Sequence, residues 1–93
     1  MQQSQIRLVL ESIAANIRLR RDALQITQEE LAYRTRLHIN QIQNVELAKS
    51  NPTITTLLIL AEALETNLGA LLRKRKFTKP QRGRPINQKK ASP

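Results

Sequence analysis

Amide side chains gather on one side of a short segment, residues 39–47, that is expected to be helical. At about 100° per residue, Asn40, Gln43 and Asn44 share one face of that helix. Asn and Gln side chains can form two hydrogen bonds with adenine through its N6 and N7 atoms, so this face suits the base edges in the major groove of DNA. The alternative is a plain solvated surface, because Asn and Gln are mostly exposed in proteins.

The neighbouring positions give this helix an inner side and two flanks. Ile42 and Val45 point the opposite way, toward a core, while Ile39 and Gln41 lie on the flanks. An exposed Ile can pack on a thymine methyl group. His38 stands where it can cap the helix, and we expect a cap or a neighbour of a DNA phosphate there. A metal ligand is the weaker interpretation, because the chain has no Cys and no second His.

A second candidate for DNA binding follows Lys79, where the chain reads Arg82, Gly83, Arg84, Pro85. Narrow A-tract minor grooves carry a strong negative potential that attracts inserted Arg side chains. Gly83 has no side chain, so the backbone could approach the groove floor. The sequence Arg-Gly-Arg-Pro resembles an AT-hook, a short motif that binds AT-rich minor grooves. The alternative is an unspecific basic tail that binds DNA through counterion release alone.

The formal net charge of +9 is confined to the C-terminal end. Residues 1–72 hold seven basic and seven acidic side chains, whereas residues 73–93 hold nine basic and none that is acidic. A polyanion is the expected partner. A membrane surface would need apolar residues among these charges, and the tail offers only Phe77 and Ile86, so nucleic acid is favoured.

A length of 93 residues suffices for one small domain with a marginal core. No Cys, one His and no Gly-rich phosphate loop argue against an enzyme, a metal site or a cofactor. Arg7 and Glu11 interrupt the first apolar run, so no secretory signal is recognised, and no run reaches the roughly 20 apolar residues of a membrane span. We expect a cytoplasmic, nucleoid-associated protein encoded by a bacterium, phage or plasmid.

Apolar periodicity and capping residues predict an all-α chain. Thr27, Thr53 and Asn67 are expected N-caps, with Glu30 completing a capping box on Thr27. The composition beyond Lys76 cannot bury a core and predicts disorder in the unbound state. The expected helices span about residues 4–24, 28–35, 39–47, 54–65 and 68–74.

The middle of the chain resembles the lambda-repressor-like, or Cro-type, helix-turn-helix family over about residues 13–72. The matching residues are Ile17, Arg21, Ile26–Ala32, Ile42, Val45, Glu46, Asn51, Pro52, Thr56, Leu57, Ala61 and Leu64. The resemblance implies a five-helix DNA-binding domain at 13–72. Residues 1–12 would then extend the first helix, and 73–93 would form a disordered basic tail.

The resemblance also implies roles for single residues. Gln28 would donate to a DNA phosphate, and Arg21 and Glu46 would form a structural ion pair. The alternative for that pair is a solvated surface contact contributing about 0–1 kcal/mol. The DNA contacts would come from His38, Ile39, Asn40, Gln41, Gln43, Asn44, Lys49 and Asn51.

Four residues depart from the family pattern. Arg36 stands in the turn where Gly is usual, and it would cost about 1 kcal/mol relative to Gly if the backbone is left-handed. Leu47 and Ala48 replace a commoner polar-Gly helix end, and Arg20 stands where Leu is usual.

Family members usually bind operators as dimers, and two surfaces could pair this chain with itself. One carries Ile6, Val9 and Leu10 on the extension of the first helix, although these residues could instead pack on the chain's own fifth helix. The other is the fifth helix, with Leu68, Leu71 and Leu72. The sequence leaves the choice open.

The leading interpretation is a sequence-specific regulator, a dimeric repressor or controller that reads the major groove with residues 39–47 and AT-rich flanks with its tail. One alternative is an antitoxin, whose DNA binding would be autoregulatory and whose partner would be a toxin protein. Another is an architectural or RNA-binding protein of low specificity. Only Tyr33 and Phe77 could stack on bases, which argues against single strands and RNA.

Overall fold

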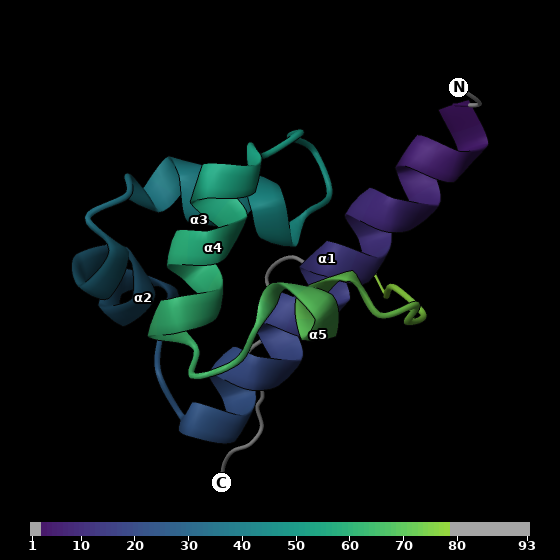
Figure 1. Ribbon diagram of the computed structural model, residues 1–93. Helices are drawn as coiled ribbons and strands as arrows, with labels where there is room; N and C mark the ends of the chain where they lie inside the picture. Colours follow the sequence, from purple (N-terminus) through teal and green to yellow (C-terminus); the bar gives the residue numbers. More distant parts are fainter. Residues whose placement is uncertain (1–2, 79–93) are drawn as a thin grey trace, which may run out of the picture.

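The computed structural model describes residues 3–78, and this part of the chain contains five α-helices and no strand (Figure 1). They are α1 (Gln3–Leu24), α2 (Gln28–Thr35), α3 (Ile39–Glu46), α4 (Ile54–Ala63) and α5 (Leu68–Leu72). The all-α prediction is confirmed. The fourth and fifth helices end two residues earlier than predicted. The AT-hook-like residues lie outside the described part.

One apolar core joins all five helices. Its largest fully buried apolar side chains are Ile17, Leu31, Ile42, Leu60, Leu64 and Leu71. The buried part of α1 is confined to Ser12–Ile17, and the first turns of α1 project beyond the rest of the bundle (Figure 1). The core therefore holds the middle of α1, and the turns before Ser12 contribute no buried side chain.

Three predicted N-caps are confirmed. The side-chain oxygens of Thr27, Thr53 and Asn67 each accept a hydrogen bond from the backbone N–H three residues later, at 3.0, 3.0 and 2.8 Å. The reciprocal contact expected of Glu30 is not formed. Its carboxylate instead accepts a hydrogen bond from Nε of Arg34 at 2.9 Å, because a residue four positions on lies on the same helix face.

Four helices end on a left-handed residue that is not Gly. Gln25, Arg36, Ala48 and Glu65 have φ of 57°, 62°, 58° and 58°. A left-handed residue lets the next N–H groups reach back to the last carbonyls of the helix, which satisfies acceptors that would otherwise lack partners. The turn between α2 and α3 therefore keeps its left-handed geometry despite the replacement of Gly by Arg36.

Arg20 has a role that explains its departure from the family pattern. Its Nε and Nη2 donate to the carbonyl of Leu64 at 3.1 and 2.9 Å, and Nη2 also donates to that of Glu65 at 3.2 Å. These carbonyls close α4, where the partial negative charge of the helix dipole favours a cation. Arg20 thus fastens the end of α4 to α1.

The chain after α5 returns along α1 and is held there by a buried amide. Asn16 is 3% exposed, and its Nδ2 donates to the carbonyls of Leu71 and Arg73, both at 2.8 Å. Its Oδ1 accepts from Nε of Arg75. A buried amide with all these groups paired is a strong local constraint.

Two further side chains of α1 extend this attachment. The Ser12 hydroxyl accepts from the N–H of Arg75 at 3.1 Å. Arg18 Nη2 donates to the carbonyl of Thr78 at 2.6 Å, and its guanidinium lies 5.2 Å from the centre of the Phe77 ring. The composition of the tail did not predict these contacts, which fix the described start of the basic segment on α1.

Candidate nucleic-acid interface

The amide-bearing face of α3 is turned outward. Ile42 and Val45 are 1% and 4% exposed and anchor the inner side of α3 in the core. Asn40, Gln43 and Asn44 are all exposed. The predicted orientation of the helix is therefore confirmed, because the two buried residues leave it only one rotation about its axis.

The two flanking residues of α3 differ from each other. Gln41 is exposed, and its Oε1 accepts a hydrogen bond from the backbone N–H of His38 at 3.0 Å. This contact caps the start of α3 and leaves the Nε2 group of Gln41 to donate outward. Ile39 is half-buried, so only part of its side chain could reach a thymine methyl group.

A buried carboxylate fixes the other end of α3. Glu46 is 2% exposed, and its oxygens accept hydrogen bonds from Nε and Nη2 of Arg21 at 2.8 and 3.0 Å. Arg21 Nη1 also donates to the carbonyl of Ile26 at 3.1 Å. The two parallel bonds form the bidentate geometry that suits a guanidinium and a carboxylate. The predicted structural ion pair is present, and its burial rules out the solvated surface alternative.

The same carboxylate has a third donor that sequence reasoning missed. Gln28 Nε2 donates to Oε1 of Glu46 at 3.0 Å. This bond ties the first turn of α2 to the end of α3. The second N–H of the same amide group remains available for a phosphate, so the predicted role of Gln28 stays a proposal. The Glu46 carboxylate also raises the pKa of Arg21, chiefly because it accepts a side-chain hydrogen bond from the charged guanidinium.

A small hollow of about 230 Å³ lies between α3 and the start of α4. Asn44, Asn51 and Ser50 are among its lining residues. The Ser50 hydroxyl is buried and has no hydrogen-bond partner within residues 3–78. Sequence reasoning missed Ser50, because a lone Ser in a loop carries no periodic signal. Lys49, like Asn51, is exposed beside this hollow.

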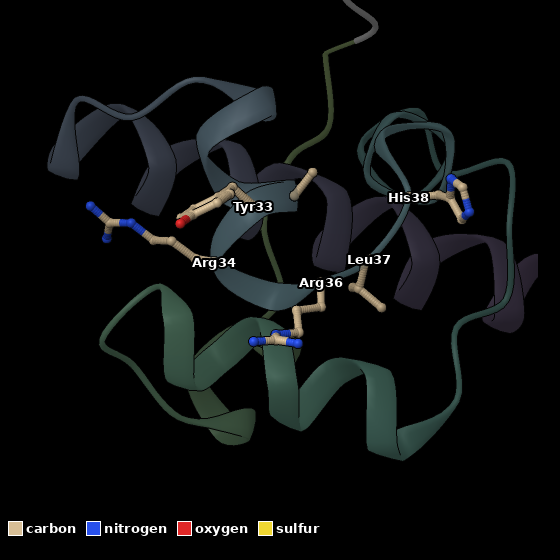
Figure 2. A pocket seen from close by; sticks show the side chains of 6 residues that line it. Tyr33, Arg34, Arg36, Leu37 and His38 are labelled. Carbon is tan, nitrogen blue, oxygen red and sulfur yellow. The ribbon is translucent and has the colours of Figure 1, made fainter.

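A broader hollow of about 670 Å³ lies at the turn between α2 and α3 (Figure 2). Tyr33 is 82% exposed there, and Figure 2 shows its ring and the His38 ring pointing to opposite sides of the turn. Arg34 and Arg36 are both exposed, and Arg34 forms an ion pair with Glu30. His38 is thus exposed at the start of α3, which agrees with its predicted place.

The extension of α1 also touches the end of α3. Arg7 Nη1 donates to the carbonyl of Ala48 at 2.7 Å, and its Nε lies 3.3 Å from a carboxylate oxygen of Glu11. The guanidinium therefore meets the carbonyl end of α3, where a cation is favourable. Residues outside the family resemblance thus help to fix the orientation of α3.

Two other kinds of site find no support within residues 3–78. No helix there combines the length and the apolar character needed to cross a membrane. That part of the chain also has no group of three or more His, Cys, Asp or Glu side chains placed to hold a metal ion.

Comparison with known proteins places this arrangement in a family. The sequence profile described as Helix-turn-helix matches residues 17–71. The control protein C.SmaI of Serratia marcescens is 41% identical over 64 residues, which make up 69% of this chain and 76% of that protein.

Solved structures of controller proteins have the same fold as this chain. The restriction-modification controller protein C.AhdI of Aeromonas hydrophila matches with a TM-score of 0.64 and 29% identity, over 67% of this chain and 94% of that one. The controller protein C.Esp1396I, solved as a tetramer in complex with its natural 35-base-pair operator, matches with a TM-score of 0.63 and 28% identity, over 68% of this chain and 83% of that one.

The family match covers more than half of the chain and contains α2, α3 and the buried pair that joins α1 to α3. The chain therefore belongs to the lambda-repressor-like helix-turn-helix family, and it is a DNA-binding transcriptional regulator rather than an enzyme.

Proposed function

We propose that this protein binds an operator as a dimer and controls transcription from it, with α3 of each subunit in the major groove. The observation that carries this proposal is the exposed amide face of α3, Asn40, Gln43 and Asn44, on a helix held at both ends. A rigid support matters because base contacts need side chains placed within a fraction of an ångström. Bidentate Asn or Gln contacts favour adenine.

The flanks of α3 would supply contacts to the DNA backbone. Gln28, Lys49 and Asn51 surround α3 with donors. Contacts to phosphates fix the register of a protein on the duplex, whereas contacts to base edges select the sequence. Substitutions at the residues that contact phosphates should therefore weaken binding to all sequences alike, whereas substitutions on the amide face of α3 should change the sequence preference.

The proposal can be tested by selecting bound sites from a random DNA library with three proteins: the wild type, Asn40→Ala and Asn44→Ala. We expect each variant to lose about 1–3 kcal/mol of discrimination at one base pair of each half-site. Gln3→Ala, which removes an exposed amide at the start of α1, is the matched control and should keep the wild-type sequence preference. An unchanged preference in both α3 variants would refute the proposal.

The relatives favour a controller over the antitoxin alternative. The control protein C.SmaI is similar in sequence, the two controllers named above share the fold, and one of them is a tetramer on its operator. We infer that the present chain likewise serves a small gene cluster of the restriction-modification type. A gene pair for an endonuclease and a methyltransferase beside its own would support this, and operator-dependent reporter expression would measure it.

Exposed apolar side chains on α1, α4 and α5 favour dimer formation. Leu8, Val9, Ile54, Leu58 and Leu72 are between 41% and 60% exposed. Several of them border a hollow of about 660 Å³ between the extension of α1, the start of α4 and the end of α5. Monomers rarely expose large apolar patches.

Both surfaces considered from the sequence would contribute to this patch with fewer residues than expected, because Ile6 and Leu10 on the extension of α1 are half-buried. Leu71 is fully buried in the core and Leu68 is half-buried, so α5 contributes only Leu72 to the exposed patch. The packing of the short α5 against α1 explains this, since a five-residue helix can present only one or two side chains outward.

Leu8→Glu and Leu72→Glu should convert a dimer into a monomer in sedimentation equilibrium at tens of micromolar. Leu19→Glu is the matched control, because Leu19 is 49% exposed on α1 but lies outside this patch. The dimer should bind half-sites about 10 bp apart. A wild type that is monomeric at these concentrations would refute the dimer.

The basic tail is proposed to hold the same duplex from its minor groove. The support is the sequence of Lys79, Arg82, Gly83, Arg84 and Pro85. Because segment 73–78 is fixed on α1, truncation should be made after Thr78 so that those contacts remain. Removing 79–93 should flatten the slope of log K against log salt by about 0.9 for each lost phosphate contact. An unchanged slope would refute the minor-groove role.

A further inference from the structure

A small pocket at the junction of α1, α5 and segment 73–78 is lined by three arginines. Its volume is about 230 Å³, and Arg20, Arg73 and Arg75 line it together with Asn16 and Thr66. Leu19 and Ala70 complete the wall. No residue of α2, of α3 or of the loops beside them contributes, so the pocket is separate from the proposed DNA-reading face.

The charge in this pocket is not balanced by the protein. None of its lining residues is acidic. The chain from residue 73 to its end contains no Asp or Glu side chain. The guanidinium groups carry like charges and repel each other, although solvent screens part of this repulsion because Arg73 and Arg75 are exposed. The pocket therefore carries an excess of positive charge that a bound anion would neutralise.

Two of the three guanidinium groups are already held in place. Arg20 is fixed by the carbonyls of Leu64 and Glu65, and Arg75 by Oδ1 of the buried Asn16. Each fixed group uses only some of its five N–H donors, and the rest remain for a ligand. Groups ordered in advance lose less entropy when they bind.

We propose that Arg20, Arg73 and Arg75 form a binding site for a phosphoryl group. Guanidinium groups match the oxygens of phosphate with paired, charge-assisted hydrogen bonds. The volume is several times the roughly 30 Å³ that one water takes in the liquid, so a phosphoryl group fits with some of its hydration. The Thr66 hydroxyl lies at the same pocket and adds a neutral donor.

Binding there would connect three parts of the fold. Arg20 belongs to α1 and closes α4, whereas Arg73 and Arg75 belong to the segment that leads to the basic tail. An anion bridging them would strengthen the attachment of that segment to α1. The ligand is either a free phosphorylated molecule or a backbone phosphate of a DNA segment on this face.

The test uses the full chain labelled with ¹⁵N, titrated with inorganic phosphate and with pyrophosphate at constant ionic strength against chloride. We expect saturable shifts of the Asn16 side-chain amide and of the Thr66 and Ala70 backbone amides. Arg73→Gln should weaken pyrophosphate binding about tenfold, because it removes charge-assisted hydrogen bonds. Arg73 makes no side-chain hydrogen bond within residues 3–78, so this variant should fold normally.

Lys76→Gln is the matched control, since it removes the same charge from the same segment but does not line the pocket. It should weaken binding less than about twofold. Equal weakening by both variants, shifts of the same size along α3, or no saturable shift would each overturn the proposal.

A duplex without an operator sequence distinguishes the two sources. If the duplex displaces pyrophosphate from the pocket of the wild type, the natural ligand is a DNA phosphate. If pyrophosphate still binds to protein saturated with DNA, the ligand is a free phosphorylated molecule. The site is independent of the function proposed for α3, because Asn40→Ala should leave these titrations unchanged.

Discussion

The buried ion pair between Arg21 and Glu46 allows a quantitative test of how α3 is held. Replacing Arg21 by Met removes three hydrogen bonds, two to Glu46 and one to the carbonyl of Ile26. The Glu46 carboxylate, 2% exposed, then keeps Gln28 as its remaining partner. Breaking a buried pair by removing one partner costs about 3–5 kcal/mol. The Arg21 side chain is 17% exposed, so water replaces part of the lost interaction and we expect about 3 kcal/mol.

That loss is large for a domain of this size. Stabilities of about 0.05–0.15 kcal/mol per residue give a total of about 4–11 kcal/mol for residues 3–78. A loss of about 3 kcal/mol should lower the Tm by about 12–24 °C, at about 4–8 °C for each kcal/mol. Urea unfolding followed by circular dichroism at fixed protein concentration measures the free energy of unfolding directly.

The double variant Arg21→Met, Glu46→Leu separates two explanations of the loss. Replacing both charges with apolar groups of similar size removes the unpaired buried charge, so the double variant should lie within about 1 kcal/mol of the wild type. A single variant that costs less than about 1 kcal/mol would mean that the pair behaves as an exposed one. A double variant as unstable as the single one would refute the burial argument.

Three further predictions concern pH, helix ends and the attachment of segment 73–78. The hydrogen bond to Glu46 raises the pKa of Arg21 above the usual arginine value. The stabilisation that charged Arg21 provides is therefore complete below the usual arginine pKa, and it is lost only when the pH rises through the raised pKa. Between about pH 6 and 9, protonation changes of Arg21 should therefore hardly alter the difference in free energy of unfolding between the wild type and Arg21→Met. Urea unfolding curves recorded at several pH values measure this difference. Arg36→Gly should stabilise the fold by about 0.5–1 kcal/mol, because Gly adopts the left-handed backbone at φ 62° without strain. Arg36→Ala, which keeps a Cβ atom, should give no such gain in the same urea experiment. Asn16→Ala should cost about 1–3 kcal/mol, since it leaves the carbonyl of Leu71 without its side-chain donor. Hydrogen exchange should then show lost protection of the Arg75 amide, and full protection in this variant would contradict the role given to Asn16.

The sequence alone determined the helices and the orientation of α3. Caps such as Thr53 and Asn67 act on a backbone N–H only three residues away, so their effect is local and can be recognised without a fold. The inner position of Ile42 and the outer position of Asn40 follow from helical periodicity in the same way. The family resemblance added the pairing of Arg21 with a residue 25 positions later.

Apart from the pair of Arg21 and Glu46, only the tertiary structure decided which long-range partners the polar side chains take. Arg20 binds the end of α4, Arg7 the end of α3, and Gln28 the carboxylate of Glu46. An Arg or Gln side chain has several possible partners within reach of its flexible chain, and only the packing of helices selects among them. Asn16 shows the same, because a polar residue in the middle of an apolar helix face gives no sign of the returning segment that it holds. Local chemistry thus defines the elements, whereas the contacts between them depend on distances that exist only in the folded chain.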